Sequence, residues 1–101
     1  MANICDNTFF ASSENQESLN VLAAFLEENL SVDFIDQSED YLDLQFSSRW
    51  VFPCEVFEEL LKEHKELSED TTLYMRCLST EYGCDYVSYR TYRDGAWDIR
   101  F

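Results

Sequence analysis

The sequence predicts an α+β fold in which two amphipathic helices cover one face of an antiparallel sheet. Three observations support this prediction. Leucines recur at helical spacing between Leu19 and Leu30, a second amphipathic run follows Pro53, and Tyr41–Ser47 alternates between polar and apolar residues like a half-buried strand. The length of 101 residues is sufficient for one domain with its own hydrophobic core.

The first half of the chain is predicted to form a strand, a helix and two further strands. Asn3–Phe10 has the loose alternation of a first strand. Ser13, followed by Gln16 three residues later, is predicted to be the N-cap of a helix with a capping box. The buried stripe of this helix comprises Leu19, Leu22, Ala23, Leu26 and Leu30, widened by Val21 and Phe25. The two strands that follow are Val32–Asp36 and Tyr41–Ser47, the second with Leu42, Leu44 and Phe46 inward.

The second half is predicted to form a helix and three strands. Pro53 suits the first helical position, where its missing N–H costs nothing, and the amphipathic run extends to Leu67. The predicted buried face of this helix consists of Val56, Phe57, Leu60 and Leu61. The remaining segments are the strand Leu73–Leu78, a turn at Glu81-Tyr82-Gly83, the strand Asp85–Tyr92, an Asp-Gly hairpin turn at Arg93-Asp94-Gly95, and the strand Ala96–Phe101 with Trp97, Ile99 and Phe101 on one face. The order β-α-β-β-α-β with an additional C-terminal hairpin contains a split β-α-β unit and predicts a ferredoxin-like sandwich.

The formal net charge of −14 is the main clue to partners. It disfavours nucleic acid and anionic membranes as direct partners, because both are arrays of negative charge, and it favours a basic protein. Aromatic residues make up 16% of the chain, which contains only two glycines and one proline, so the charge belongs to an ordered domain rather than to a disordered acidic tail. The chain opens into polar sequence without a basic n-region or a long apolar stretch, so we expect a cytoplasmic protein that is neither secreted nor membrane-spanning.

The cysteines and the single histidine do not predict catalysis or metal binding. Cys5, Cys54, Cys77 and Cys84 lack CxxC spacing, and they are expected to be reduced thiols. Cys54 follows Pro53 at the predicted start of a helix, but no histidine is positioned beside it, and His64 is expected at the surface. Residues 36–40 lack the glycine and the final glutamate of a calcium-binding EF-hand loop. We therefore expect no cofactor and no metal.

Several short motifs resemble one known family. They are Asn3-Ile4-Cys5-Asp6-Asn7-Thr8 at the start, Phe52-Pro53 before a helix, then Tyr82-Gly83 and Tyr92-Arg93-Asp94-Gly95. Together they resemble a ferredoxin-like domain family found on conjugative plasmids and in phages. The resemblance covers most of the chain and implies a fold and a mobile-element origin. It implies no activity, so no functional residue is transferred from the family.

The acidic residues are concentrated in the first half of the sequence. Residues 1–48 contain ten acidic residues and neither lysine nor arginine, whereas residues 49–101 contain eleven acidic and seven basic residues. Such a single-sign segment is either a solubility feature or an imitation of the phosphate array that nucleic-acid-binding proteins recognise. The predicted centre of a partner-binding surface is Asp33, Asp36, Glu39, Asp40 and Asp43, with Glu14, Glu17, Glu27 and Glu28 as its helical continuation.

A second candidate surface is the sheet face opposite the helices. The predicted strands would place Tyr74, Arg76, Tyr86, Arg90 and Tyr92 on this face. Aromatic and arginine side chains on an open sheet resemble the base-stacking surface of RNA-recognition domains, but the required motifs are missing and the net charge opposes RNA binding. We expect these side chains to serve packing or a protein interface.

Three functional hypotheses follow from the sequence. The first is a non-enzymatic phage or plasmid protein that inhibits a host nucleic-acid-handling protein, of the anti-CRISPR or anti-restriction type, by occupying its basic surface. The alternative is a ferredoxin-like accessory or assembly domain whose charge serves solubility only. Under this alternative the chain can also associate as a homodimer. An enzyme is the third, and it would require a concave pocket with convergent polar groups. Convergence of the acidic residues on one surface distinguishes the first hypothesis from the second.

Overall fold

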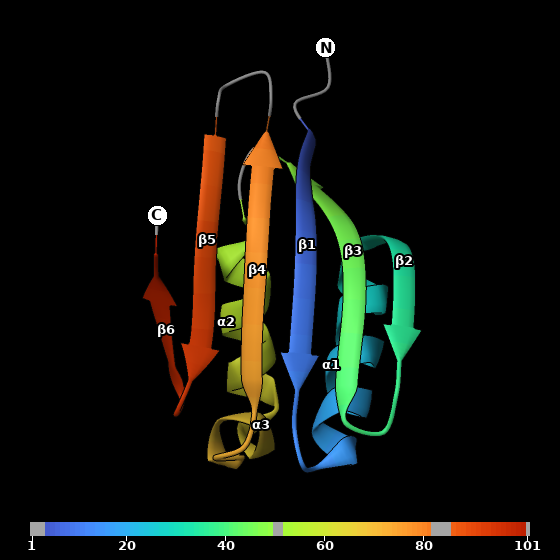
Figure 1. The fold of residues 1–101 in the computed structure, drawn as a ribbon, viewed down its shortest axis with the longest axis vertical. Helices are drawn as coiled ribbons and strands as arrows, with labels where there is room; N and C mark the ends of the chain where they lie inside the picture. The colour runs from blue at the N-terminus through green and yellow to red at the C-terminus, as the bar shows by residue number, and fades with distance from the viewer. Residues whose placement is uncertain (1–3, 50–51, 82–85, 101) are drawn as a thin grey trace.

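The computed structural model describes residues 4–49, 52–81 and 86–100, and these residues form an α+β fold (Figure 1). Within them a six-stranded antiparallel sheet has the strand order β2-β3-β1-β4-β5-β6. The elements are β1 (Ile4–Ser12), α1 (Gln16–Asn29), β2 (Ser31–Gln37), β3 (Tyr41–Arg49), α2 (Cys54–Glu63), α3 (Lys65–Glu69), β4 (Tyr74–Glu81), β5 (Tyr86–Arg93) and β6 (Ala96–Ile99).

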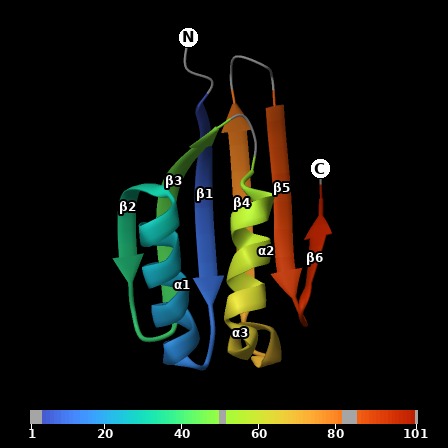
Figure 2. The ribbon, with the colours of Figure 1, turned by 180° about the vertical axis from the view of Figure 1, so that it is seen from behind.

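Both long helices lie on one face of the sheet, as the sequence predicted. They are behind the sheet in Figure 1 and in front of it in Figure 2, while the other sheet face is uncovered. The core fills the space between the layers and contains the predicted inward residues of β3, Leu42, Leu44 and Phe46. The predicted helix stripes also face this core: Leu19, Leu22, Leu26, Phe57 and Leu60 are buried, and Leu30, Val56 and Leu61 pack against it while partly exposed.

A buried polar cluster lies at the centre of the sheet. The side chain of Asn7 on β1 is buried and donates from Nδ2 to the carbonyl oxygens of Cys5 and Phe46 and to Ser48 Oγ, at 3.2, 3.3 and 2.9 Å. Its Oδ1 accepts a hydrogen bond of 2.6 Å from Ser79 Oγ on β4. One amide group therefore connects β1 to both neighbouring strands, and it satisfies polar groups that are buried or half-buried in the sheet.

Aromatic rings connect the C-terminal hairpin to α2. Trp97 on β6 makes edge contacts with Phe52 and Phe57, with ring centroids 5.7 Å apart in both pairs, and Phe52 stacks on Phe57 at 5.0 Å. Such tilted and offset pairs add roughly 0.5–1.5 kcal/mol each beyond their buried area. Ile99, two residues after Trp97 on β6, is 63% exposed, and Phe101 lies outside the described residues. The contacts explain how a four-residue edge strand is held against the sheet.

The predicted Asp-Gly turn is confirmed between β5 and β6. Asp94 and Gly95 both have positive φ, at 54° and 78°. Two consecutive residues with positive φ define the type I′ turn, whose twist matches that of antiparallel strands. The other predicted turn, Glu81-Tyr82-Gly83, begins at the last residue of β4, and its remaining residues lie outside the described part.

The predicted N-cap of the first helix is wrong by two residues. Asn15, not Ser13, is the N-cap of α1, and its side chain accepts a hydrogen bond from the backbone N–H of Glu17. The Ser13 hydroxyl instead donates to Asp70 Oδ2 at 2.5 Å. A partner that is distant in the sequence has therefore displaced the local capping arrangement that the sequence pattern predicted.

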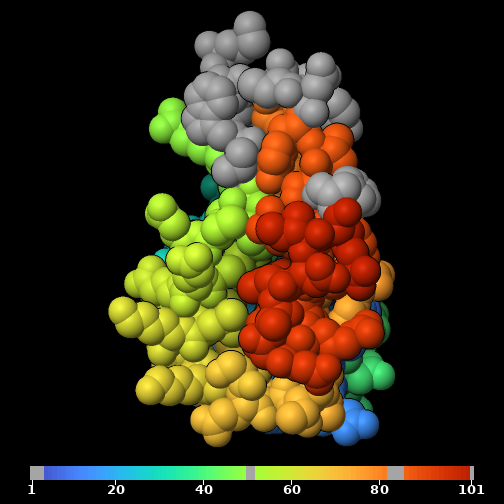
Figure 3. Space-filling model, turned by 90° about the vertical axis from the view of Figure 1, so that its left-hand side faces the viewer, coloured from blue at the N-terminus to red at the C-terminus, as the bar shows by residue number. Residues whose placement is uncertain are grey.

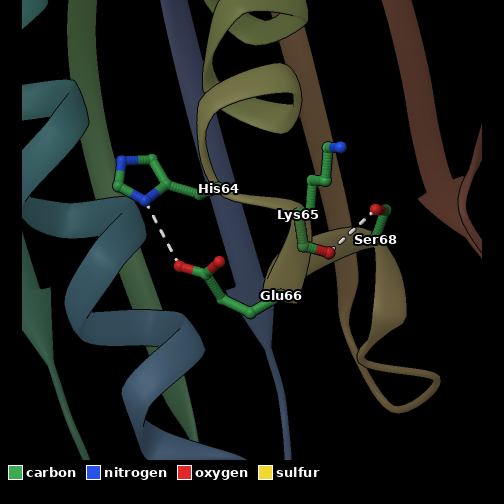
Figure 4. A network of polar contacts seen from close by, with 4 residues as sticks. All are labelled: His64, Lys65, Glu66 and Ser68. Carbon is green, nitrogen blue, oxygen red and sulfur yellow. Dashed lines mark hydrogen bonds and ion pairs between the residues drawn. The ribbon is translucent and has the colours of Figure 1, made fainter.

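The second predicted helix is also interrupted. It ends at Glu63, and His64, with φ −121° and ψ 74°, separates α2 from the short α3. Figure 4 shows the break, where His64 Nδ1 lies 3.2 Å from Glu66 Oε1 and Ser68 Oγ donates to the carbonyl of Lys65. The His64 ring contacts the edge of Phe25 on α1. No glycine or proline marks this site, so the interruption accompanies a tertiary contact that helical periodicity does not encode.

Asp70 joins two loops at the end of the molecule where α1 begins. Its carboxylate accepts hydrogen bonds from the hydroxyls of Ser13, Ser18 and Thr72, and from the backbone N–H of Thr72. Burial raises the pKa of Asp70, but the hydrogen bonds from Ser13, Thr72 and Ser18 lower it more, so its pKa lies below the ordinary value. The charged form is therefore stabilised by the fold.

We predict that replacing Asn7 by leucine destabilises the protein by about 1–3 kcal/mol, because Ser48, Ser79 and the carbonyl of Phe46 lose their buried partner. The free energy of unfolding in urea measures this loss. The matched control is Thr8→Val, the neighbouring residue, whose side chain is on the exposed face of β1. Equal stability of the Asn7→Leu variant and the wild type would contradict the role assigned to the amide.

We predict that Asp70 makes stability depend on acid pH. Because its folded pKa is depressed, its contribution is present above the unfolded pKa and is lost as the pH falls through the folded pKa. Asp70→Asn should cost roughly 1–3 kcal/mol near neutral pH and flatten the stability profile below about pH 4. Urea unfolding over a pH series tests this expectation, with the exposed neighbour Glu69→Gln as control. An unchanged profile in Asp70→Asn would refute it.

Candidate functional site

The nine predicted partner-binding residues do not lie on one face of the molecule. Glu17, Glu27 and Glu28 are exposed on α1, and Glu14 precedes this helix. Asp33 and Asp36 are on β2 and Asp43 is on β3, where they occupy the opposite, uncovered side of the sheet. Glu39 and Asp40 form the turn between these strands, and Ser13 N donates to the carbonyl of Asp40, which brings this turn next to Glu14. The structure therefore divides the predicted site into two parts.

We call the part on the uncovered sheet side the acidic flank, consisting of Asp33, Asp36 and Asp43. Asp36 and Asp43 are directly opposite each other in the β2–β3 pairing. Directly opposed like charges destabilise a strand pair. A register shift between Val32 and Phe34 marks a bulge at Asp33, which accepts a hydrogen bond of 3.0 Å from Ser47 Oγ on β3. The bulge therefore adds a third carboxylate beside the opposed pair.

The carboxylates of the β2–β3 hairpin jointly affect the ionisation of Tyr41. Its hydroxyl donates to Asp36 Oδ2 at 3.1 Å, and its ring stacks on Phe10 of β1 with centroids 6.4 Å apart. The hydrogen bond to Asp36 and the nearby charges of Asp36, Asp43 and Asp40 raise the pKa of Tyr41 above its ordinary value. The phenol is therefore held in its protonated, hydrogen-bond-donating form by three carboxylates.

Arginines gather on the other half of the same sheet face, which we call the basic flank: Arg76, Arg93 and Arg100. The Arg76 guanidinium lies 4.4 Å from the ring centroid of Phe10, and that of Arg93 lies 5.2 Å from the centroid of Tyr74. Arg100 forms a salt bridge of 3.3 Å with Asp98. In the described part of the chain, neither Arg76 nor Arg93 has a carboxylate partner. Both guanidinium groups are available for a further anionic contact.

The predicted composition of the open sheet face is only partly correct. Tyr74 and Arg76 lie there, but Tyr86, Arg90 and Tyr92 face the helices. Tyr92 is only 1% exposed, and the Arg90 guanidinium is 4.1 Å from the ring centroid of Phe52. The reason is register. Met75 pairs with Tyr92, so even-numbered residues of β4 share a face with odd-numbered residues of β5.

The exposed surface of the helices carries most of the negative charge. Ten glutamates are exposed on or beside the three helices, together with only two basic residues, Lys62 and Lys65. We call this surface the acidic helix layer; its glutamates are Glu14, Glu17, Glu27, Glu28, Glu55, Glu58, Glu59, Glu63, Glu66 and Glu69. Ten acidic and two basic residues leave −8 of the total charge of −14 on this layer. The sequence analysis counted charge by halves of the chain and therefore did not include the six glutamates of α2 and α3 in the predicted site. The prediction that both helices cover the same sheet face could have indicated them.

The cysteines do not form a nucleophilic site in the described part of the chain. Cys5, Cys54 and Cys77 are free thiols, as predicted for these three, and Cys84 lies outside the described residues. Burial raises the pKa of Cys5, and raises that of Cys77 to about 12, so neither forms a thiolate readily. Cys54 Sγ is exposed at the start of α2, 3.4 Å from a nitrogen of Arg90. His64 is ten residues away at the other end of the helix, about 15 Å along its axis, and cannot act as its base.

Two shallow grooves adjoin Phe52 and Cys54 at the start of α2. One, of about 440 Å³, is lined by Leu30, Ser48, Arg49, Phe52, Pro53, Cys54, Glu55 and Val56. The other, of about 260 Å³, is lined by Phe52, Cys54, Phe57, Glu58, Arg90, Trp97 and Ile99. Among residues 4–49, 52–81 and 86–100, no cluster of three or more potential ligands could hold a metal ion, including at the Asp36–Asp40 segment.

The comparisons with known proteins do not assign a function. No family model, no curated protein and no solved structure matches the chain. Within the described residues, no helix has the length and apolar character needed to cross a membrane. The surfaces of the molecule are therefore the available guide to its function.

We predict that Asp36→Asn lowers the pKa of Tyr41 toward its usual value near 10, because it removes the leading cause of the upward shift. An NMR titration of ring-labelled tyrosine measures this change. The control is Asp33→Asn on the same strand, which bonds to Ser47 rather than to Tyr41. Equal pKa values of Tyr41 in the wild type and Asp36→Asn would show that the carboxylates do not converge on it.

Proposed function

We propose that this chain is a non-enzymatic binding protein that contacts a basic, nucleic-acid-binding protein through its acidic helix layer. The observation that carries the proposal is the strong excess of negative charge on this surface, ten exposed glutamates against two lysines. An ordinary solvated surface mixes both signs, whereas a field of one sign attracts an oppositely charged partner and accelerates association. The partner would belong to the class that normally binds phosphate arrays.

The spacing of the carboxylates supports mimicry of a nucleic acid. Glu55, Glu59 and Glu63 recur every four residues on α2, which places them about 6 Å apart along the helix axis. The helices hold them in fixed positions because Phe57 and Leu60 are buried on the other side of α2, as Leu22 and Leu26 are on α1. A rigid array loses less conformational entropy on binding than a flexible acidic tail would.

The location of the turn between β2 and β3 extends this surface. Glu39 and Asp40 adjoin Glu14 through the backbone contact between Ser13 and Asp40, and Gln37 Nε2 donates to Asn20 Oδ1 on α1 at 2.7 Å. Asp33, Asp36 and Asp43 lie on the other side of the sheet, and one flat partner surface cannot cover both sides. We therefore move the proposed centre from the hairpin to the helix layer.

A more specific assignment of the fold is also a proposal. We propose that β1 to β4 with α1 and α2 form a ferredoxin-like unit to which β5 and β6 are added. The arrangement β2-β3-β1-β4, with two helices on one face, supports this assignment. A phage or plasmid origin, with a host CRISPR or restriction protein as the partner, is the corresponding biological proposal.

The proposal predicts that neutralising the helix layer weakens binding without loss of the fold. The triple variant Glu55→Gln, Glu59→Gln, Glu63→Gln should lower affinity roughly tenfold, if each exposed contact contributes about 0.2–1 kcal/mol. Proteins captured from a nuclease-treated bacterial lysate by the wild type would be purified and titrated against both chains at two salt concentrations. A double-stranded DNA oligonucleotide should compete for the captured protein.

The matched control removes three exposed carboxylates elsewhere, through Asp6→Asn, Asp94→Asn and Asp98→Asn. It should retain the captured protein with nearly wild-type affinity. Equal losses in both triple variants, or a captured protein that DNA does not displace, would contradict mimicry by the helix layer. In that case the charge serves solubility, and the accessory-domain alternative is preferred.

A further inference from the structure

The uncovered sheet face combines exposed apolar groups with aromatic rings. Ile4, Phe34, Leu78 and Val87 lie on it by register, and Phe34 and Val87 are each 52% exposed. Phe10, Tyr41 and Tyr74 lie together at the end of this face where β1 ends and β3 and β4 begin. Antiparallel sheets covered on one side usually have polar residues on the other, and exposed apolar side chains grouped on one face mark interaction sites.

The charges on this face separate by side. The acidic flank, Asp33, Asp36 and Asp43, is on β2 and β3. The basic flank, Arg76, Arg93 and Arg100, is on β4 and β5 and directly after β6. Arg49, at the last position of β3, pairs with Ile4 and by register also lies on this face, so the acidic side keeps a net negative charge of three carboxylates against one arginine. In Figure 1 these strands are at the right and the left of the sheet, with β1 between them. Asp6 on β1 lies between the flanks, and Asp98 is offset by its salt bridge with Arg100.

This separation restricts the partner. A nucleic acid or an acidic protein is repelled by the acidic flank, and a uniformly basic protein is repelled by the basic flank. The fitting surface carries the same two charges in the reverse order. We propose that this surface is a second copy of the chain, and that two copies pack open face to open face around a two-fold axis parallel to the strands.

The direction of the axis follows from the charges. Rotation by 180° about an axis parallel to the strands exchanges the two edges of the sheet, so each acidic flank faces the other copy's basic flank. An axis in the interface plane but perpendicular to the strands would place acidic flank on acidic flank. Near the parallel axis, β1 of one copy faces β4 of the other, which brings Arg76 close to Phe10 of the second copy.

The dimension and charge of the face are compatible with this packing. Five strands of seven to nine residues and the four-residue β6, about 4.8 Å apart, give roughly 700 Å² per copy, or about 1,400 Å² in total, within the range of specific interfaces. The face carries five carboxylates and, with Arg49, four arginines, so nearly all of the charge of −14 is elsewhere. Both acidic helix layers point outward in the dimer, with two sheets between them, which limits their mutual repulsion.

The oligomeric state of the full chain tests the proposal. Sedimentation velocity over a concentration series at low salt should show the wild type approaching twice its mass of 12.0 kDa. Two charge-reversed variants, Arg76→Glu with Arg93→Glu and Asp36→Lys with Asp43→Lys, should each weaken the dimer at least about a hundredfold, because like charges then face each other. An equimolar mixture of the two should restore the dimer, since one copy is then acidic and the other basic on both flanks. Arg76→Lys with Arg93→Lys should remain dimeric.

The outcomes decide the proposal in either direction. A wild type that stays monomeric over the whole series overturns it. Dimers that persist in both charge-reversed variants, or a mixture of folded variants that stays monomeric, also overturn it because the flanks do not then set the pairing. Circular dichroism confirms that each variant is folded. If a variant does not fold, the methyl NMR signals of Leu78 and Val87 in the wild type decide: they must shift with concentration, and constant signals overturn the proposal.

Discussion

The hydrogen-bonded pairing of β1 with both β3 and β4 is the constraint on which the rest of the structure depends. Pairing in register transfers the alternation of β1 to its neighbours, and through them to β2, β5 and β6. Because Asn7, Phe9 and Ala11 face the helices, the facing residues of every other strand are determined, and so is the composition of the open side. The Asn7 amide strengthens this constraint because it accepts from Ser79 and donates to Ser48 on the two neighbouring strands. A shift of one residue would bury Thr8 and leave this amide in water.

The fold redistributes charge relative to the sequence. The first 48 residues contain no basic residue, yet they contribute to two different surfaces, because β1, β2 and β3 each expose one side while α1 covers the other. Conversely, the mixed second half places six of its seven glutamates on α2 and α3 and four of its five arginines on the open sheet face. Figure 3 shows these elements from the β6 edge, where the helices and the outer strands form adjacent bands of the surface. Charge is therefore best counted for each layer of the fold, helices or sheet, rather than for each half of the sequence.

The sequence was sufficient for those features that depend on local periodicity. The stripe from Leu19 to Leu26, the inward Leu42, Leu44 and Phe46, and the positive φ values at Asp94 and Gly95 all follow from spacing or turn chemistry. The errors arise where a distant residue decides. Asp70 takes the Ser13 hydroxyl away from the cap, Phe25 contacts His64 where the helix is interrupted, and the register of Met75 with Tyr92 turns Arg90 and Tyr92 inward. The candidate site was less predictable than the fold for the same reason, since strand register and layer membership decide which carboxylates meet.

The two proposed surfaces differ in a way that explains why one suits a foreign partner and the other suits a second copy. A surface with one sign of charge repels itself, so the acidic helix layer cannot be self-complementary at any orientation. A surface with opposite charges on its two flanks is self-complementary only under a two-fold rotation that exchanges the flanks. The open face meets this condition through Asp36 and Asp43 on one side and Arg76 and Arg93 on the other. Because the sheet separates the two surfaces, occupation of one leaves the other accessible, and a dimer would present two acidic helix layers on opposite sides of the assembly.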